Sequence, residues 1–152
     1  MRSSTPVKTV RKIGLKRAYE PAEPGDGYRV LVDRLWPRGL SKQDLPLDLW
    51  DKDLAPTPRL RQWFGHDPDK WSEFRRQYRR ELSTSAQKAR LRDLLTHAGS
   101  RPLTLVYGAK DSLHTHAIVL REMLTNARKY PRPESRPSQT RRLSRGPSPR
   151  SP

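Results

Sequence analysis

Runs of apolar residues flanked by glycine or proline predict four β-strands. The two clearest runs are residues 28–33 and residues 103–107. Both are rich in aliphatic residues, and the second is almost entirely apolar, which is typical of a buried central strand. Residues 10–19 alternate in part between apolar and polar, and residues 45–49 form a shorter run, so each predicts one further strand.

The middle of the chain has the spacing of helices. Trp71, Phe74, Tyr78 and Leu82 follow one another at intervals of three, four and four residues, which predicts one apolar helix face. The pair Asp67-Pro68 just before them is typical of a helix N-terminus.

Capping residues predict three further helices. Thr57-Pro58 begins a short helix that ends near Gly65, and residues 85–99 form a second that ends at a glycine. The last helix is predicted to begin at Asp111 or Ser112. Its predicted buried face consists of Leu113, Ala117, Leu120 and Leu124.

This order of elements predicts an α/β fold, with a small, mostly parallel sheet of about four strands and helices packed on it. About eight residues link the first predicted strand to the second. That link is short for a parallel crossover, so the pairing of the first strand stays open. Residues 13–127 are expected to form this single domain.

Most of the positive charge lies outside the predicted domain. The 152 residues include 32 Lys and Arg against 16 Asp and Glu, which gives a formal net charge of +16. Residues 1–12 carry +4 and residues 128–152 carry +7, which leaves +5 on residues 13–127. The last segment is rich in Pro, Ser and Arg and has few large apolar residues. Residues 128–152 are therefore predicted to be a disordered basic tail, and residues 1–12 a basic extension.

Several classes of protein are excluded by what the chain lacks. There is no cysteine, which rules out disulfides, thiolate nucleophiles and cysteine-based metal sites. No apolar run reaches the ~18 residues of a membrane span, and the first ten residues have no apolar signal core, so a cytoplasmic protein is expected. Phosphate-loop and dinucleotide motifs are missing. His114 and His116 would diverge on a helix, so neither a metal nor a cofactor is predicted.

Two charged segments directly follow the two clearest strands. The first is Asp33-Arg34-Leu35-Trp36-Pro37-Arg38-Gly39. The second is Tyr107-Gly108-Ala109-Lys110-Asp111, with His114 and His116 expected in the first turn of the next helix. Ligands of open α/β sheets bind beyond the carboxyl ends of strands. If the two strands are parallel neighbours, both segments face one crevice.

These residue types suit a small anionic ligand, such as a nucleotide or a phosphorylated metabolite. Arginine grips phosphate or carboxylate with two parallel hydrogen bonds, lysine adds a compact charge, and a helix N-terminus adds free N–H groups. The predicted ligand-binding residues are Arg34, Trp36, Arg38, Tyr107 and Lys110. Acid–base chemistry, with hydrolysis as the candidate reaction, is assigned to Asp33, Asp111 and His116.

The same residues also allow a structural interpretation. Asp33 can pair with Arg34 or Lys110. Alternation along a strand places Asp33 and Arg34 on opposite faces, so at most one of them needs to face a given crevice. A non-catalytic interaction protein therefore stays an alternative.

Nucleic acid is the alternative partner. The basic ends of the chain can contact phosphates without sequence preference, and so can four arginines on one predicted helix. Those four are Arg75, Arg76, Arg79 and Arg80. A solvated outer helix face explains them equally well. The sequence leaves the oligomeric state open.

Residues 13–124 resemble the YeaO-like family of small bacterial proteins, a domain family of unknown function. The resemblance rests on the long and unusual run 33–39, on residues 16–21 and 47–52, and on residues 103–111 with His116-Ala117. It implies a compact α/β domain and names no reaction. Longer relatives carry two cysteines in the element after the buried strand. This chain has none, so the resemblance implies no cysteine chemistry here.

Overall fold

The computed structural model describes residues 12–129. Its strands are β1 (Ile13–Arg17), β2 (Tyr28–Leu31), β3 (Leu49–Trp50) and β4 (Leu103–Tyr107). Its helices are α1 (Pro58–Phe64), α2 (Trp71–Leu82), α3 (Ser85–Ala98) and α4 (His116–Lys129). Three 3-10 turns lie between them: η1 (Pro24–Asp26), η2 (Lys52–Leu54) and η3 (Pro68–Lys70).

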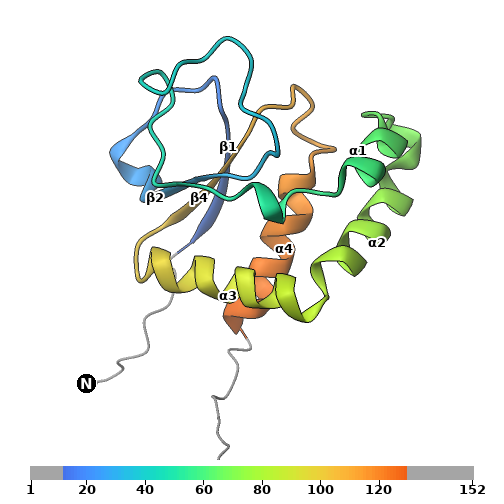
Figure 1. Cartoon of the computed structure of the whole chain (residues 1–152). Helices are drawn as coiled ribbons and strands as arrows, with labels where there is room; N and C mark the ends of the chain where they lie inside the picture. Colours follow the sequence, from blue (N-terminus) through green and yellow to red (C-terminus); the bar gives the residue numbers. More distant parts are fainter. Residues whose placement is uncertain (1–11, 130–152) are drawn as a thin grey trace, which may run out of the picture.

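All strands of the sheet are parallel, in the order β1-β4-β2-β3. The predicted α/β fold with a small parallel sheet is thereby confirmed. The structure also settles the pairing of the first strand. β1 pairs with β4 and not with β2, because β4 lies between them. A loop that contains the 3-10 turn η1, rather than an α-helix, returns the chain from the end of β1 to the start of β2 (Figure 1).

Local capping signals begin and end the helices. The Thr57 side chain accepts a hydrogen bond from the Leu60 N–H at the start of α1, and Gly65 ends this helix in the left-handed conformation. Asp67 caps η3, which leads directly into α2. In α3 the cap is Thr84, one residue before the predicted start, and Gly99 follows the last turn.

The predicted start of the last helix is wrong. Asp111 Oδ1 accepts hydrogen bonds from the N–H groups of Leu113 and His114, and these close a turn instead of starting a helix. α4 begins only at His116. Leu113, predicted to be buried, is 73% exposed as a result. The other predicted core positions of this helix, Ala117, Leu120 and Leu124, are buried.

The two faces of the sheet are covered differently. The helices lie together on one face (Figure 1). There the side chains of Val30, Leu103 and Leu105 pack into a core with residues from all four helices. The other face is covered by the loops around residues 18–27 and 32–48. Leu31 and Val106 pack there against Leu45, in a smaller apolar cluster.

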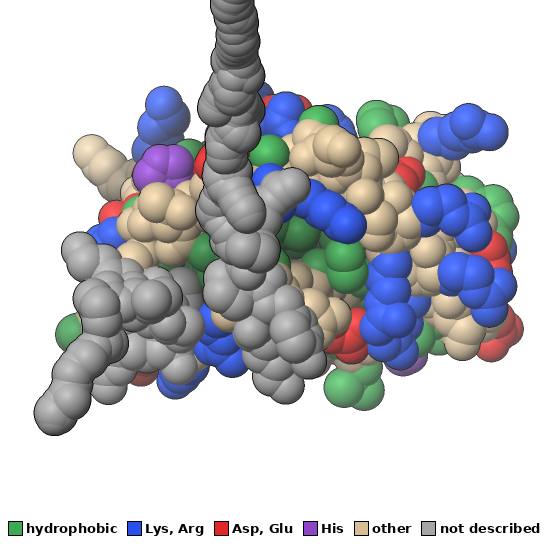
Figure 2. Space-filling view, turned by 90° about the horizontal axis from the view of Figure 1, so that it is seen from below, with side chains coloured by type: hydrophobic (Ala, Val, Ile, Leu, Met, Phe, Trp, Pro, Cys, Tyr) green, Lys and Arg blue, Asp and Glu red, His purple; other side chains and the backbone are tan. Residues whose placement is uncertain are grey.

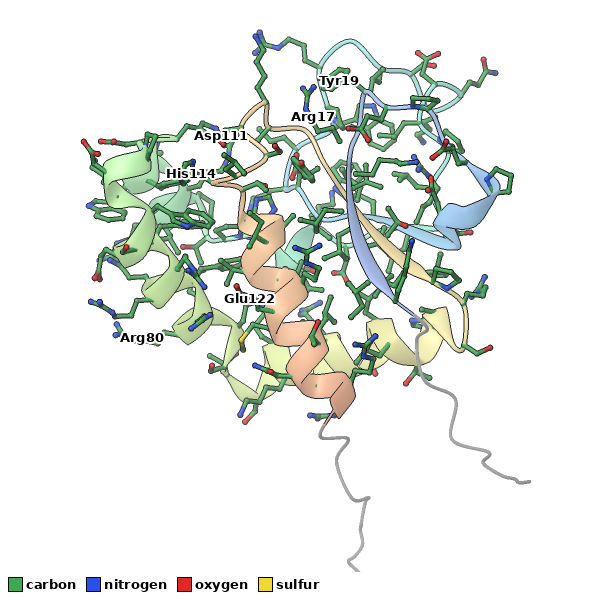
Figure 3. The ribbon with its side chains drawn as sticks, turned by 180° about the vertical axis from the view of Figure 1, so that it is seen from behind. Arg17, Tyr19, Arg80, Asp111, His114 and Glu122 are labelled. Atoms are coloured by element: carbon green, nitrogen blue, oxygen red, sulfur yellow. The ribbon has the colours of Figure 1, made fainter. Side chains whose placement is uncertain are left out.

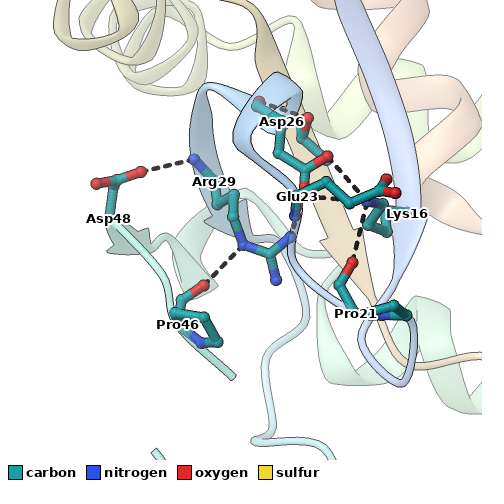
Figure 4. A network of polar contacts seen from close by, with 8 residues as sticks. Lys16, Pro21, Glu23, Asp26, Arg29, Pro46 and Asp48 are labelled. Carbon is teal, nitrogen blue, oxygen red and sulfur yellow. Dashed lines mark hydrogen bonds and ion pairs between the residues drawn. The ribbon is translucent and has the colours of Figure 1, made fainter. Parts of the chain in front are cut away.

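A buried carboxylate joins three strands on the loop-covered face. Asp26 accepts hydrogen bonds from Lys16 Nζ of β1 at 2.9 Å and from Arg29 Nη1 of β2 at 2.6 Å (Figure 4). Its backbone carbonyl accepts a hydrogen bond from Thr104 Oγ1 of β4. Burial raises the pKa of Asp26, but the bonds from Lys16, the Glu23 N–H and Arg29 outweigh it, so the net pKa is lowered. The carboxylate therefore stays ionised in a buried position.

The predicted basic ends lie almost wholly outside the described residues. α4 extends to Lys129, so two residues of the segment predicted as a disordered tail, 128–152, are helical. Within residues 12–129, no helix has the length and apolar character needed to cross a membrane.

The start of β2 depends on a glycine, which gives a test of the fold. Gly27 has a φ of 66°, and a Cβ at this position would overlap the Pro102 carbonyl beside β4. Gly27→Ala should therefore lower the free energy of unfolding in urea by about 3 kcal/mol. Gly25→Ala is the matched control, because no atom lies within 4 Å of its Cβ position. Equal stability of the two variants would contradict this account.

Candidate functional site

A cavity of about 290 Å³ opens beyond the carboxyl ends of β2 and β4. Its walls come from the segment after β2, the segment after β4, α1 and its end, and the start of α4. The polar and charged residues that line it are Tyr19, Asp33, Arg34, Arg38, Arg61, His66, His114, Thr115 and His116. Phe64, Phe74 and Trp36 contribute aromatic surface. The cavity therefore lies at the edge of the sheet where the sequence predicts a crevice.

Asp33 joins the ends of the two strands. Its Oδ2 accepts a hydrogen bond from the Gly108 N–H at 2.8 Å. A Cβ on residue 108 would stand 3.1 Å from the same oxygen, so the glycine allows this close approach. Both Asp33 and Arg34 line the cavity, so the expectation that they face opposite ways is wrong. The reason is that β2 ends at Leu31, and the chain bends before it reaches them.

His116 forms a pair with Asp33. Its Nε2 lies 3.0 Å from the Val32 carbonyl oxygen and 3.4 Å from Asp33 Oδ1. Because a carbonyl oxygen can only accept, Nε2 carries a proton, and the neutral ring has its lone pair on Nδ1. Burial lowers the pKa of His116, and the Asp33 carboxylate opposes this only in part. The imidazole is therefore neutral at neutral pH.

Three arginines give the cavity its positive charge. Arg34 Nη2 donates to the carbonyls of Ala55 and Pro56 over long distances of 3.4 and 3.3 Å. Arg34 Nε has no acceptor within the described residues. Arg38 and Arg61 are exposed and line the cavity from two different segments. The guanidinium groups of Arg38 and Arg61 are therefore accessible to a ligand, whereas Arg34 Nε is buried.

A second pair of an aspartate and a histidine lies at the edge of the cavity. His114 Nδ1 is 2.8 Å from Asp111 Oδ2, and the two side chains lie side by side in Figure 3. The Trp71 ring meets the His114 ring edge-on at 5.5 Å. The hydrogen bond from His114 is the main reason that the pKa of Asp111 is lowered. His114 lines the cavity and Asp111 does not.

Three of the predicted site residues lie outside the cavity wall. Tyr107 faces the helix-covered core and is buried, since residues alternate along β4. Lys110 is exposed on the turn after β4, and Asp111 is engaged in closing that turn. Trp36 does line the cavity, but its Nε1–H donates to the Leu40 carbonyl and its ring packs on Trp50.

Comparison with known proteins identifies the family. A family model described as "Inactive DUF488-N3 subclade" matches residues 12–141. This chain belongs to that subclade. No solved structure matches it.

Two relatives of this DUF488-N3 protein cover the same domain. "Uncharacterized protein YeaO" of Escherichia coli is 49% identical over 113 residues, which are 74% of this chain and 96% of the relative. "Uncharacterized protein Rv3073c" of Mycobacterium tuberculosis is 41% identical over 113 residues, which are 74% of this chain and 93% of the relative. The resemblance to the YeaO-like family that the motifs predicted is thereby confirmed.

Five polar lining residues of the DUF488-N3 domain were not predicted from the sequence: Tyr19, Arg61, His66, His114 and Thr115. Arg61 and His66 come from α1 and its end, far along the chain from either charged segment. His114 belongs to the second charged segment, but the sequence analysis assigns it neither ligand binding nor acid–base chemistry. Its spacing of three residues from Asp111 is a signal that could have been used, whereas nothing local points to Arg61. Among residues 12–129, no group of three or more His, Cys, Asp and Glu side chains is placed to hold a metal ion.

The arginine-rich face of α2 is partly neutralised. Basic side chains gather over the part of the molecule that contains α2 (Figure 2). However, Arg75 and Arg79 both form ion pairs with Glu122 of α4, and Arg76 pairs with Glu73. Arg80 points away from the body of the molecule (Figure 3). These four arginines therefore do not present one uninterrupted basic surface.

The buried histidine predicts a pH dependence of stability. The pKa of His116 is lower in the folded than in the unfolded chain, so the unfolded chain binds more protons as the pH falls. The free energy of unfolding should decrease between about pH 7 and about pH 5, a window above the titration of the carboxylates. His116→Gln should reduce this decrease in urea unfolding experiments. His97→Gln, outside the cavity, is the control, and an unchanged slope in His116→Gln would contradict the assignment.

Proposed function

We propose that this protein works in the cytosol as a receptor for a small anionic metabolite, held in the cavity at the carboxyl edge of the sheet. The observation that carries the proposal is the charge of the cavity wall. Three arginines and a single carboxylate, Asp33, line it. Guanidinium groups match the geometry of phosphate and carboxylate, and a concave site strengthens their field.

The volume of the cavity and its aromatic lining restrict the class of ligand. A volume of about 290 Å³ lies at the lower end of what ligand pockets have, which favours one phosphorylated or carboxylated metabolite of mononucleotide size or smaller. Phe64 and Phe74 provide apolar surface beside the cations. A ligand with an anionic group and a ring or short apolar part fits this combination.

Binding without turnover is favoured over hydrolysis. The matching family model describes its members as inactive. Asp33 Oδ2 accepts from the Gly108 N–H, while Oδ1 has no hydrogen-bond partner among the described residues, and the His116 Nε2 proton is directed at the Val32 carbonyl. Asp111, the third residue assigned to acid–base chemistry, does not line the cavity. The sequence predicts hydrolysis as a candidate reaction, but these contacts do not favour it.

A nucleic-acid partner has less support within the described residues. Three of the four arginines on α2 are paired with carboxylates, so their field toward a phosphate backbone is weakened. The basic ends that also suggested this partner lie outside the described residues. A protein partner without catalysis stays compatible with the receptor function, because a cavity of this kind can also hold an acidic side chain.

Removing single arginines should test the receptor function. Phosphomonoesters, mononucleotides and dicarboxylates should raise the melting temperature of the wild-type protein relative to chloride at equal ionic strength. Arg38→Ala and Arg61→Ala should each weaken the apparent affinity roughly tenfold, since each removes hydrogen bonds to a charged group.

Lys110→Ala is the matched control, because it removes one exposed positive charge outside the cavity wall. Its binding should stay close to that of the wild-type protein. The proposal fails if no anion raises the melting temperature, or if Lys110→Ala weakens binding as much as the two arginine variants do.

A further inference from the structure

One histidine of the cavity wall has an unusual backbone. Among residues 12–129, His66 is the only residue other than glycine with a positive φ, at 57°. It directly follows Gly65, whose φ is 55°. L-residues rarely adopt this left-handed region, because the Cβ approaches the backbone, whereas glycine adopts it freely.

The turn at the end of α1 explains why residue 66 has this conformation. The Gly65 N–H donates to the Arg61 carbonyl, and the Asp67 N–H donates to the Phe64 carbonyl at 3.0 Å. Asp67 then caps η3. These bonds reverse the chain within three residues, and a glycine at position 66 would satisfy them without strain. The backbone therefore gives no reason for a histidine here.

The fold makes no polar use of the His66 side chain. Its ring lies 6.1 Å from the ring of Phe64, in a tilted arrangement. Within the described part of the chain it takes part in no hydrogen bond or ion pair, and it is exposed at the cavity. A strained residue whose nitrogens are unengaged and which faces a cavity suggests a ligand contact.

The end of α1 adds positive charge to the cavity on the side of His116. Arg61 contributes, after burial, to lowering the pKa of His116, so its charge acts at this site. The three lining arginines and Asp33 give the wall a net charge of +2 when the histidines are neutral. This charge complements a dianion better than a monoanion.

We infer that His66 is a ligand-binding residue of this cavity, and that the anionic group it contacts is a dianion of the phosphate monoester or sulfate type. The inference rests on the proposed receptor function and deepens it. A phosphate monoester is close to dianionic at neutral pH, whereas a single carboxylate carries one charge. The His66 ring can donate a hydrogen bond to an oxygen of such an anion.

Sulfate and acetate are the probes, because sulfate is a dianion and acetate a monoanion at the pH of the experiment. Binding is followed at constant ionic strength through the histidine ring resonances in NMR spectra of the full chain. Sulfate should bind the wild-type protein about tenfold more tightly than acetate. His66→Gly should melt at the wild-type temperature or above it, because strain is removed. It should bind sulfate at least about threefold more weakly.

His66→Asn is a second variant, since asparagine tolerates the left-handed region but cannot become charged. It should fold normally and also bind sulfate more weakly than wild type. His97→Gln, in α3 and outside the cavity, should leave sulfate affinity unchanged.

The results that would contradict this inference differ from those that would contradict the receptor function. If the His66 variants bind sulfate as wild type does while Arg61→Ala binds it more weakly, the inference is overturned and the receptor function stands. A lower melting temperature of His66→Gly would assign the side chain to folding and overturn the inference as well. Equal affinity for acetate and sulfate would overturn the dianion assignment. A wild-type protein that binds no anion would remove both proposals.

Discussion

The position of the site depends on the buried carboxylate of Asp26. Lys16 of β1 and Arg29 of β2 donate to its side chain, and Thr104 of β4 donates to its backbone carbonyl. A carboxylate in this environment is costly to desolvate, and it is tolerated because two cations and a backbone N–H satisfy it. Within residues 12–129 no α-helix covers this face of the sheet, so the network and the surrounding loops hold β4 between β1 and β2 there. That placement makes the ends of β2 and β4 neighbours.

The cavity then follows from what these neighbouring strand ends carry. Asp33 bonds the Gly108 N–H and so connects the two segments, and His116 reaches back from α4 to the Val32 carbonyl. The carboxylate and the neutral histidine occupy one side of the site. Three arginines from two separate segments supply the positive charge, and Asp33, the single lining carboxylate among the described residues, does not balance it. The cavity wall therefore carries a net positive charge, while Asp33 Oδ2 and His116 Nε2 are engaged by backbone groups.

The distribution of charge matters more than its total. The formal net charge of +16 is mostly carried by the two ends of the chain. On α2 the basic residues that look like a binding surface in the sequence are paired with Glu122 and Glu73. At the cavity, by contrast, none of Arg34, Arg38 and Arg61 forms an ion pair with a carboxylate of the described residues. The few unneutralised cations inside the domain are therefore a better indication of function than the larger number outside it.

The sequence by itself determined most of the elements and the edge of the sheet where the cavity lies, because those depend on local chemistry. Thr57, Gly65 and Asp67 act within a few residues, and the apolar run 103–107 identifies a central strand wherever it is placed. Only the tertiary structure decided that β4 separates β1 from β2, that Arg61 and His66 join the wall, and that Lys110 and Tyr107 do not. The spacing of apolar residues also did not predict the turn closed by Asp111, which exposes Leu113. The hydrogen bonds of the Asp111 side chain there compete with the first helical turn. These outcomes depend on distances between residues far apart in the chain and on the residue at which each strand ends. The spacing of residues along the sequence does not determine either.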